Sequence, residues 1–348
     1  MRAIAVTLAL FAMALPALAQ EKPFQEQIDV NAVLLDVIVT DTKGNQILGL
    51  TRDDFVVKEN GIAQEVDSVD YFTNRRLLDA REENAPFKVE QVREDRYFIF
   101  FFDKPEAPAA LFDQLTNARA AVRDFIRNQM KETDRVAIVG HDVRLKVYSD
   151  FTSDKAQLER ALNDTARFGR GVLEGPAILS NVDRKTMMNK TGTVYQALDL
   201  LADAVRPIRA RKNLVLFSPG IADIQERAMN GMLIERSQYL DPAIQSLNAA
   251  NVSVYGVQLQ QQPAADTSAP IIHQRLSEIS TETGGNYFQF NTSFLPAVNR
   301  VEEANAGYYL VTYRSRKPRG EKGFQKVDVS LKNPEFRVTA RSGYQFGG

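Results

Sequence analysis

Alternating apolar and polar residues predict β-strands at both ends of the chain. Between 33 and 39 the sequence places Val, Leu, Val and Val at every second position, and 309–313 and 327–331 repeat this alternation. A period of two is typical of strands that bury one face. A further short strand is expected at 336–340, after the Asn-Pro turn that ends the preceding segment.

The two terminal β segments are expected to pack on each other. In the first of them, Asn60-Gly61 separates the apolar segments 55–59 and 62–66. Because Asn-Gly accepts the positive φ angles of a type I′ turn, a hairpin is predicted there. Two or three strands alone rarely form a stable fold in water. Residues 24–73 and 307–346 are therefore predicted to form one Ig-like β-sandwich.

The middle of the chain alternates strand-like and helix-like patterns. Apolar residues recur at three- and four-residue steps through 109–131, through 193–206 and near 272–279, where Gly284-Gly285 ends the pattern. Strands that alternate with helices of this length indicate a doubly wound, mainly parallel α/β sheet. The predicted strands are 97–102, 135–140, 213–218, 252–257 and 286–290, with an extra edge strand at 146–151.

These patterns predict two domains, one inserted in the other. The α/β domain spans 96–295 and lies between the two halves of the β-sandwich. The charged, irregular segment 74–95 is interpreted as the connection between them.

The first residues have the features of an export signal. Met1-Arg2 supplies a positive charge, 3–15 is apolar apart from Thr7, and Ala17-Leu18-Ala19 fits a small-x-small cleavage site. The apolar run is shorter than the roughly 20 residues that span a bilayer. Residues 1–19 are therefore predicted to be a signal peptide, which implies a periplasmic or extracellular protein. An uncleaved membrane anchor is the alternative.

Composition narrows the classes of function. The chain has 43 Lys and Arg against 44 Asp and Glu, so charge gives no case for binding nucleic acid or an anionic membrane. It has no Cys and two His, which removes disulfides, thiol catalysis and Cys-based zinc sites. The length suffices for two domains, and no later segment reaches transmembrane length.

Three stretches resemble the VWFA-related domain proteins first grouped from acidobacteria. The first, within 30–66, has the pattern GLT-x-DDF-x-V-x-ENG, and the second includes YFIFFFD, KNLVLFSPGI and TGGNYF. The third runs from GYYLVTYRS through FRVTARSGYQ. The resemblance implies a von Willebrand factor A-like (vWA) fold that serves as a binding scaffold for a protein partner. It also implies a possible divalent cation, such as Mg²⁺, at the carboxyl edge of the sheet.

Only part of the metal-binding pattern of that fold is present. The pattern Asp-x-Ser-x-Ser would begin at Asp103, but Pro105 and Ala107 replace the two serines. The resemblance implies Asp103, Glu106 and Thr193 as the metal ligands, with Thr191 as an alternative to Thr193. The third-loop Asp of the pattern is replaced by Ser218-Pro219-Gly220, with Asp223 close downstream.

A degenerate metal site leaves several functions open. Lys104 next to Asp103 could supply the positive charge that an ion otherwise would. The leading interpretation is a secreted, non-enzymatic module for protein interaction or adhesion, with neither its partner nor its oligomeric state fixed by the sequence. The alternatives are a metal-free structural or envelope-assembly protein, and a hydrolase that uses Asp103, Glu106 and His141.

Overall fold

The computed structural model describes most of the chain after its first 27 residues. The predicted signal peptide, 1–19, lies outside the described residues, as do Glu106 and Asp223. Among the described residues, no helix is long and apolar enough to cross a membrane. The described residues are 28–73, 89–90, 95–104, 110–167, 178–179, 182–221, 228–229, 232–233, 237–259, 269–289, 293–304, 307–318 and 321–347.

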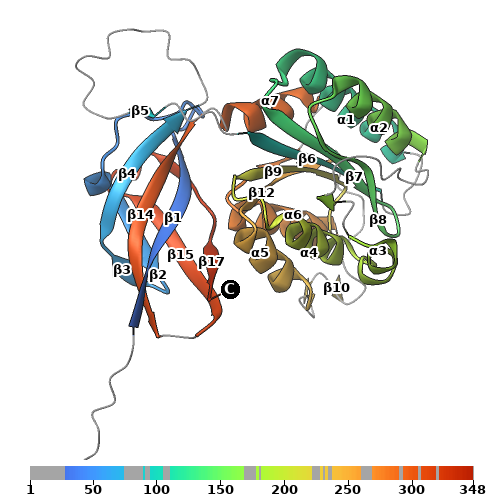
Figure 1. The fold of residues 1–348 in the computed structure, drawn as a ribbon. Helices are drawn as coiled ribbons and strands as arrows, with labels where there is room; N and C mark the ends of the chain where they lie inside the picture. The colour runs from blue at the N-terminus through green and yellow to red at the C-terminus, as the bar shows by residue number, and fades with distance from the viewer. Residues whose placement is uncertain are drawn as a thin grey trace, which may run out of the picture.

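A mixed six-stranded sheet forms the centre of the α/β part of the molecule (Figure 1). Its strands lie in the order β13-β12-β9-β6-β7-β8, and every neighbouring pair is parallel except β7 and β8. The extra edge strand expected at 146–151 is confirmed as β8. The strands are β6 (Arg96–Asp103), β7 (Asp134–His141), β8 (Leu145–Thr152), β9 (Lys212–Ser218), β12 (Val252–Gln258) and β13 (Tyr287–Phe288).

The central strands are apolar at almost every position because helices cover both faces of the sheet. In β6, Phe98, Phe100 and Phe102 pack in one buried cluster, whereas Ile99 and Phe101 pack in the other. This division follows from the alternation of side chains along a strand. The two clusters fix the sheet between its helical layers and thereby fix the positions at which its strands end.

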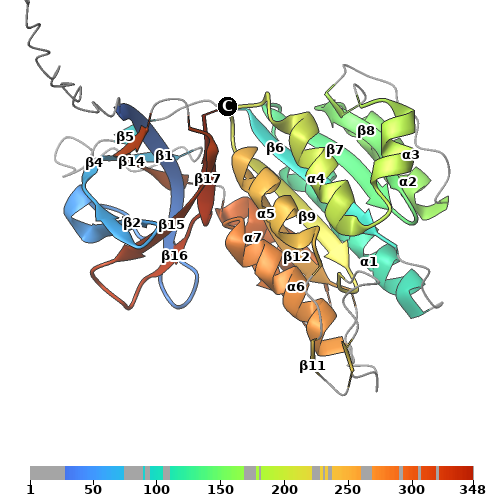
Figure 2. The same cartoon turned by 90° about the horizontal axis from the view of Figure 1, so that it is seen from below.

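Helices α1, α2 and α7 contribute to one of these clusters, and α3, α4, α5 and α6 lie on the other face (Figures 1 and 2). The helix predicted over 109–131 changes its hydrogen bonding partway, because Phe125–Gln129 forms a π-helical turn. The helices are α1 (Ala110–Asp124), α2 (Lys155–Arg167), α3 (Arg184–Lys190), α4 (Val194–Val205), α5 (Leu240–Ala249), α6 (Ala269–Glu282) and α7 (Leu295–Ala304).

The two ends of the chain build two further sheets, here called the terminal sheets. One has the order β16-β1-β14-β4-β5 and the other β17-β15-β2-β3. A separate two-stranded ribbon joins β10 (Ala228–Met229) and β11 (Met232–Leu233). The strands of the terminal sheets are β1 (Ile28–Thr40), β2 (Phe55–Glu59), β3 (Ile62–Gln64), β4 (Val66–Thr73), β5 (Val89–Glu90), β14 (Gly307–Pro318), β15 (Gly323–Leu331), β16 (Arg337–Thr339) and β17 (Gly343–Phe346).

Each terminal sheet combines strands from both ends of the chain. β1 pairs with β14 and β2 pairs with β15, both antiparallel. The predicted hairpin is confirmed, and Asn60 and Gly61 have φ angles of 48° and 83°. One prediction was wrong in part: Val89–Glu90, within the segment taken as an irregular connection, pairs with β4 as a two-residue strand. So short a strand has no period to reveal it.

A buried polar group lies inside the apolar cluster that the terminal sheets share. The Glu59 carboxylate is 5 % exposed and accepts hydrogen bonds from Tyr313 Oη at 2.8 Å, Tyr344 Oη at 2.9 Å and Ser315 Oγ at 3.0 Å. These donors come from β14 and β17. The network satisfies a carboxylate that would otherwise be costly to bury. It therefore joins strands of both terminal sheets.

The terminal sheets lie beside the helical layer around α5 (Figure 2), and hydrogen bonds join the two. Arg341 donates from one terminal nitrogen to the Asn248 carbonyl at 3.1 Å and from the other to the Leu34 carbonyl at 2.8 Å. The backbone N–H of Ser342 donates to the Glu282 carbonyl at 3.0 Å. Arg341 therefore bridges β1 and α5 directly.

Candidate functional site

Three neighbouring strands end in polar residues at one edge of the six-stranded sheet. Asp103 ends β6, His141 ends β7 and Ser218 ends β9. β6 lies between the other two strands, and Asp103 is directly opposite His141 in the register. The carboxyl ends of parallel strands share one edge of the sheet and are the usual place for a ligand site. This edge, with the turns beside it, is called the Asp103 edge.

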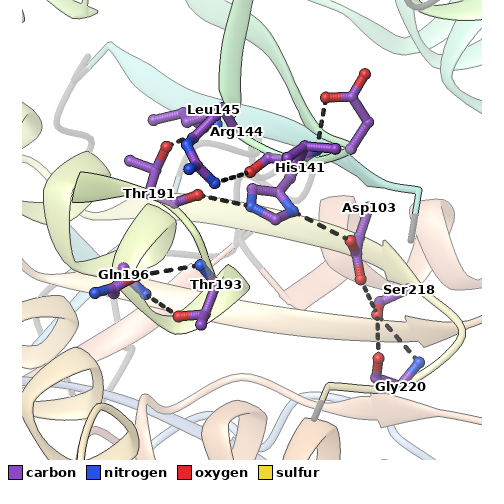
Figure 3. Close-up of polar contacts among 11 residues, drawn as sticks. Asp103, His141, Arg144, Leu145, Thr191, Thr193, Gln196, Ser218 and Gly220 are labelled. Atoms are coloured by element: carbon purple, nitrogen blue, oxygen red, sulfur yellow. Dashed lines mark hydrogen bonds and ion pairs between the residues drawn. The ribbon is translucent and has the colours of Figure 1, made fainter. Parts of the chain in front are cut away.

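The Asp103 carboxylate is held from both sides by these neighbours (Figure 3). Ser218 Oγ donates to Asp103 Oδ2 at 2.6 Å, and His141 Nδ1 lies 3.7 Å from Asp103 Oδ1. All three side chains are buried, with exposed fractions of 2 % for Asp103, 6 % for His141 and 0 % for Ser218. The carboxylate is therefore enclosed by side chains of its own sheet.

The ring of His141 is fixed by the turn before α4. Its Nε2 lies 3.0 Å from the Thr191 carbonyl oxygen, and Figure 3 shows the ring between Thr191 and Asp103. Because a carbonyl only accepts, Nε2 carries the proton in this contact. Among the described residues, Asp103 Oδ1 and His141 Nδ1 have no hydrogen-bond partner.

Thr191 and Thr193 organise the turn rather than approach Asp103. Thr191 Oγ1 accepts from the backbone N–H of Leu145 at 2.9 Å and donates to the Met187 carbonyl. Thr193 is the N-cap of α4, and its Oγ1 accepts from the backbone N–H of Gln196 at 3.2 Å. A helix N-cap is the local reason for a Thr at this position.

The described residues do not fit an Mg²⁺ site. Mg²⁺ requires near-octahedral oxygen ligands, but a serine hydroxyl donates to Asp103 Oδ2 and an imidazole nitrogen faces Oδ1. Within the part of the chain that the structure describes, no group of three or more His, Cys, Asp or Glu residues is placed to hold a metal ion. The ligand role of Glu106 lies outside the described residues and stays a prediction.

The expectation that Lys104 supplies the counter-charge of Asp103 stays a prediction. The side chain that faces Asp103 across the pairing of β6 with β7 is that of His141. Lys104 donates its backbone N–H to the His141 carbonyl at 2.7 Å. Ser218 and His141 were identifiable from the sequence, since each ends a predicted strand beside that of Asp103.

Of the residues proposed for a hydrolase, Asp103 and His141 come together, whereas Glu106 lies outside the described residues. Ser218, which was not among them, also lies beside Asp103. Asp103 and His141 are adjacent, but the Ser218 hydroxyl donates to Asp103 and not to the imidazole. A serine nucleophile requires the base within hydrogen-bond reach of its own hydroxyl. The arrangement lacks that contact, and all three groups are buried.

Exposed apolar and charged residues surround the buried core of the Asp103 edge. Val143, in the β7–β8 turn, is 55 % exposed, and Met188, on α3, is 54 % exposed. Arg144 links them by donating to the carbonyls of both, at 2.7 Å to that of Val143. Asp142 is half-buried, which opposes its ionised form, but the hydrogen bond from Lys146 holds the pKa of Asp142 below its ordinary value.

Comparisons with known proteins leave the family open. No family model and no curated protein matches the chain. Solved structures that it resembles include an aerotolerance-related membrane protein from Bacteroides fragilis, at 12 % identity over 60 % of this chain and 98 % of that one, with a TM-score of 0.37. BatB from Bacteroides thetaiotaomicron matches at 11 % identity over 60 % and 96 %, with a TM-score of 0.37.

A third resemblance is to the human COPII-coat protein Sec24c, at 9 % identity over 72 % of this chain and 44 % of that one, with a TM-score of 0.39. At these TM-scores and identities, the likenesses carry no inference about function. The resemblance to the VWFA-related family stays a prediction from the sequence.

Proposed function

We propose that the chain is an exported, non-enzymatic binding module that holds a protein partner at the Asp103 edge without a divalent cation. Its fold would be a vWA-like α/β domain, 96–295, inserted in an Ig-like β-sandwich formed by 24–73 and 307–346. The leader pattern of residues 1–19 supports export to the periplasm or beyond. The pairing of N-terminal with C-terminal strands in both terminal sheets supports the insertion.

The observation that carries the proposal is the closed shell around Asp103. The Ser218 hydroxyl donates to Oδ2 of the carboxylate, and the ring of His141 faces Oδ1. A carboxylate held in this way contributes to the sheet edge as a buried structural group. Contact with a partner then falls to the exposed rim.

Val143 and Met188 form that rim. Single exposed apolar residues are common on protein surfaces, but this pair is held by one guanidinium that binds both backbones. An apolar pair whose backbone is already fixed can lose its water on binding a partner without a further cost in backbone entropy. We therefore assign the partner contact to the rim and the positioning of the rim to the buried residues beneath it.

A capture experiment with matched variants tests this function. The mature chain is immobilised and exposed to envelope extract of the source organism, with and without excess EDTA. The double variant Val143→Asp/Met188→Asp should lose the captured protein, whereas Ile62→Asp, at a residue 69 % exposed on β3, should retain it. Circular dichroism confirms that each variant is folded.

The outcome with EDTA is equally decisive. Capture that persists in EDTA agrees with the proposal, and capture that EDTA abolishes contradicts it. Equal capture by the double variant and the unmodified chain would place the partner elsewhere on the molecule.

A further inference from the structure

A large cleft lies between the terminal sheets and the six-stranded sheet, away from the Asp103 edge. Its volume is about 1150 Å³. Its walls include Tyr97 near the start of β6 and Asn251 just before β12, so it lies at the amino ends of the strands. The Asp103 edge lies at their carboxyl ends. The cleft is therefore a separate site, and its volume is slightly above the roughly 300–1,000 Å³ of small-molecule sites.

One wall of the cleft is the outer face of a terminal sheet. In β1, Leu35 and Val37 face the buried cluster, whereas Leu34 and Asp36 line the cleft. In β14 the same alternation puts Leu310 on the cleft side. Leu34 is 48 % exposed. This wall therefore presents apolar surface to the cleft, with a single carboxylate in it.

The facing wall is cationic. The segment 206–211, between α4 and β9, and Arg341 place four guanidinium groups along the cleft. Arg206 forms an ion pair with Asp203. Among the described residues, Arg209, Arg211 and Arg341 form no ion pair.

Two of these cations are bound only by neutral groups. Arg211 donates to the Gly284 carbonyl at 2.9 Å, and Arg341 donates to the carbonyls of Asn248 and Leu34. The Nε atoms of both are buried and lack an acceptor in the described part of the chain. Carbonyl oxygens accept hydrogen bonds from these guanidinium groups but do not neutralise their positive charges. An unbalanced cluster of this kind favours an anion.

The ionisation of neighbouring groups agrees with this excess of positive charge. Burial and, to a smaller extent, the charge of Arg341 lower the pKa of Lys212 to about 8. Burial likewise holds the pKa of Arg341 below its ordinary value, although Asp36 opposes the shift. A bound anion would stabilise the protonated, cationic forms of both groups.

We propose that this cleft binds a small organic anion that combines one carboxylate or phosphate group with an apolar body. The acidic group lies against Arg209, Arg211 and Arg341, and the body covers Leu34 and Leu310. Guanidinium forks match the planar geometry of carboxylate and phosphate oxygens. Binding would join the terminal sheets to the helical layer and stabilise the whole chain.

Calorimetric titration with defined probes tests the proposal. The mature chain is titrated with decanoate, decyl phosphate, decanol and inorganic phosphate, all below micelle-forming concentrations. At least one of the two amphiphilic anions should bind saturably, and the better of them identifies the head group. Decanol and inorganic phosphate should each bind at least tenfold more weakly, because each supplies only half of the recognised chemistry.

Variants separate a charge-specific site from general apolar adsorption. Arg209→Gln should weaken binding at least tenfold, and this variant is safe for the fold because Arg209 is exposed. Leu34→Asp should weaken it similarly, and Arg300→Gln, at an exposed position on α7 outside the cleft, should not. Absence of saturable binding by both anions, equal binding of decanol, or indifference to Arg209→Gln would each overturn the proposal.

Discussion

At the scale of single residues, the Asp103 edge depends on three buried polar side chains. Asp103 Oδ2 accepts from Ser218 Oγ, while Oδ1 and His141 Nδ1 face each other at a distance too long for a hydrogen bond. A buried acceptor that loses its donor costs its full desolvation energy. The Ser218 hydroxyl is therefore the contact on which the carboxylate most depends.

Substitution of Ser218→Ala should lower the free energy of unfolding by about 1–3 kcal/mol, because it leaves a buried carboxylate oxygen without a donor. Urea denaturation at neutral pH measures the loss. The same substitution in an Asp103→Ala background should cost clearly less, since the acceptor is then absent. Equal costs in the two backgrounds would show that the Ser218–Asp103 contact contributes nothing to stability.

Lys212 makes the stability of the chain depend on pH. Its side chain is fully buried, and its pKa is about 8 in the folded chain against an ordinary 10.5. Between these values the unfolded chain binds the proton and the folded chain does not, so stability rises with pH through this window. Below pH 8 the folded state carries the whole cost of the buried ammonium.

We expect Lys212→Met to stabilise the chain at pH 7 by up to about 3 kcal/mol, less whatever the lost hydrogen bond to the Ile208 carbonyl contributes. The gain should shrink as the pH is raised from 8 toward 10.5. Chemical denaturation of both proteins across that range measures the difference. A gain that is constant with pH would mean that Lys212 does not titrate in this window.

At the scale of elements, the strands were predictable because their apolar residues follow a simple period. β6, β7, β9 and β12 lie where continuous apolar segments predicted them. β5, a two-residue strand, and β17 were missed, because short strands at sheet edges are defined by their partners and not by a period of their own. For the site too, only the positions that follow from the strand pattern were predictable.

The strand ends that carry Asp103, His141 and Ser218 follow from the predicted sheet. The contact of His141 with the Thr191 carbonyl does not follow from the predicted sheet. It depends on the path of the turn between α3 and α4, which the strand pattern leaves undetermined. Adjacency in sequence suggested Lys104 as a partner for Asp103, whereas the register between strands brings His141 opposite it.

The link between β12 and the short edge strand β13 depends on a glycine. A Cβ at Gly285 would lie 1.9 Å from the Val254 carbonyl oxygen and 2.6 Å from its carbonyl carbon. Both are backbone atoms of β12, which cannot move aside as a flexible side chain can. The close approach of the two chain segments therefore requires glycine at this position.

Gly285→Ala should accordingly lower the free energy of unfolding by about 2–4 kcal/mol. Gly192→Ala is the control, since its nearest neighbour would be the flexible Arg144 side chain at 3.3 Å, and it should cost less than about 1 kcal/mol. Thermal and urea unfolding of the two variants provide the comparison. Similar losses for both would contradict the packing around Gly285.

At the scale of the whole molecule, the two ends of the chain share sheets, a buried cluster and the Glu59 network. Arg341 then joins the terminal sheets to α5. Regions that share a core open together in native-state hydrogen exchange. The N-terminal and C-terminal strands should therefore behave as one cooperative unit.

Hydrogen exchange on the unmodified chain and on Val311→Ala, at a fully buried position of β14, tests this unit. The substitution should reduce protection by the same factor in β1, β2, β14 and β15, because all four contribute to one core. Protection that falls in β14 and β15 while β1 and β2 keep theirs would show that the ends fold separately.

The central claim is that the Asp103 edge works without a divalent cation. Calorimetric titration of residues 20–348 with Mg²⁺, Mn²⁺ and Ca²⁺ after chelator treatment, with Asp103→Ala in parallel, tests it most directly. We predict no saturable binding at millimolar ion by either protein. Saturable binding by the unmodified chain that Asp103→Ala abolishes would contradict the account and restore a metal-dependent site.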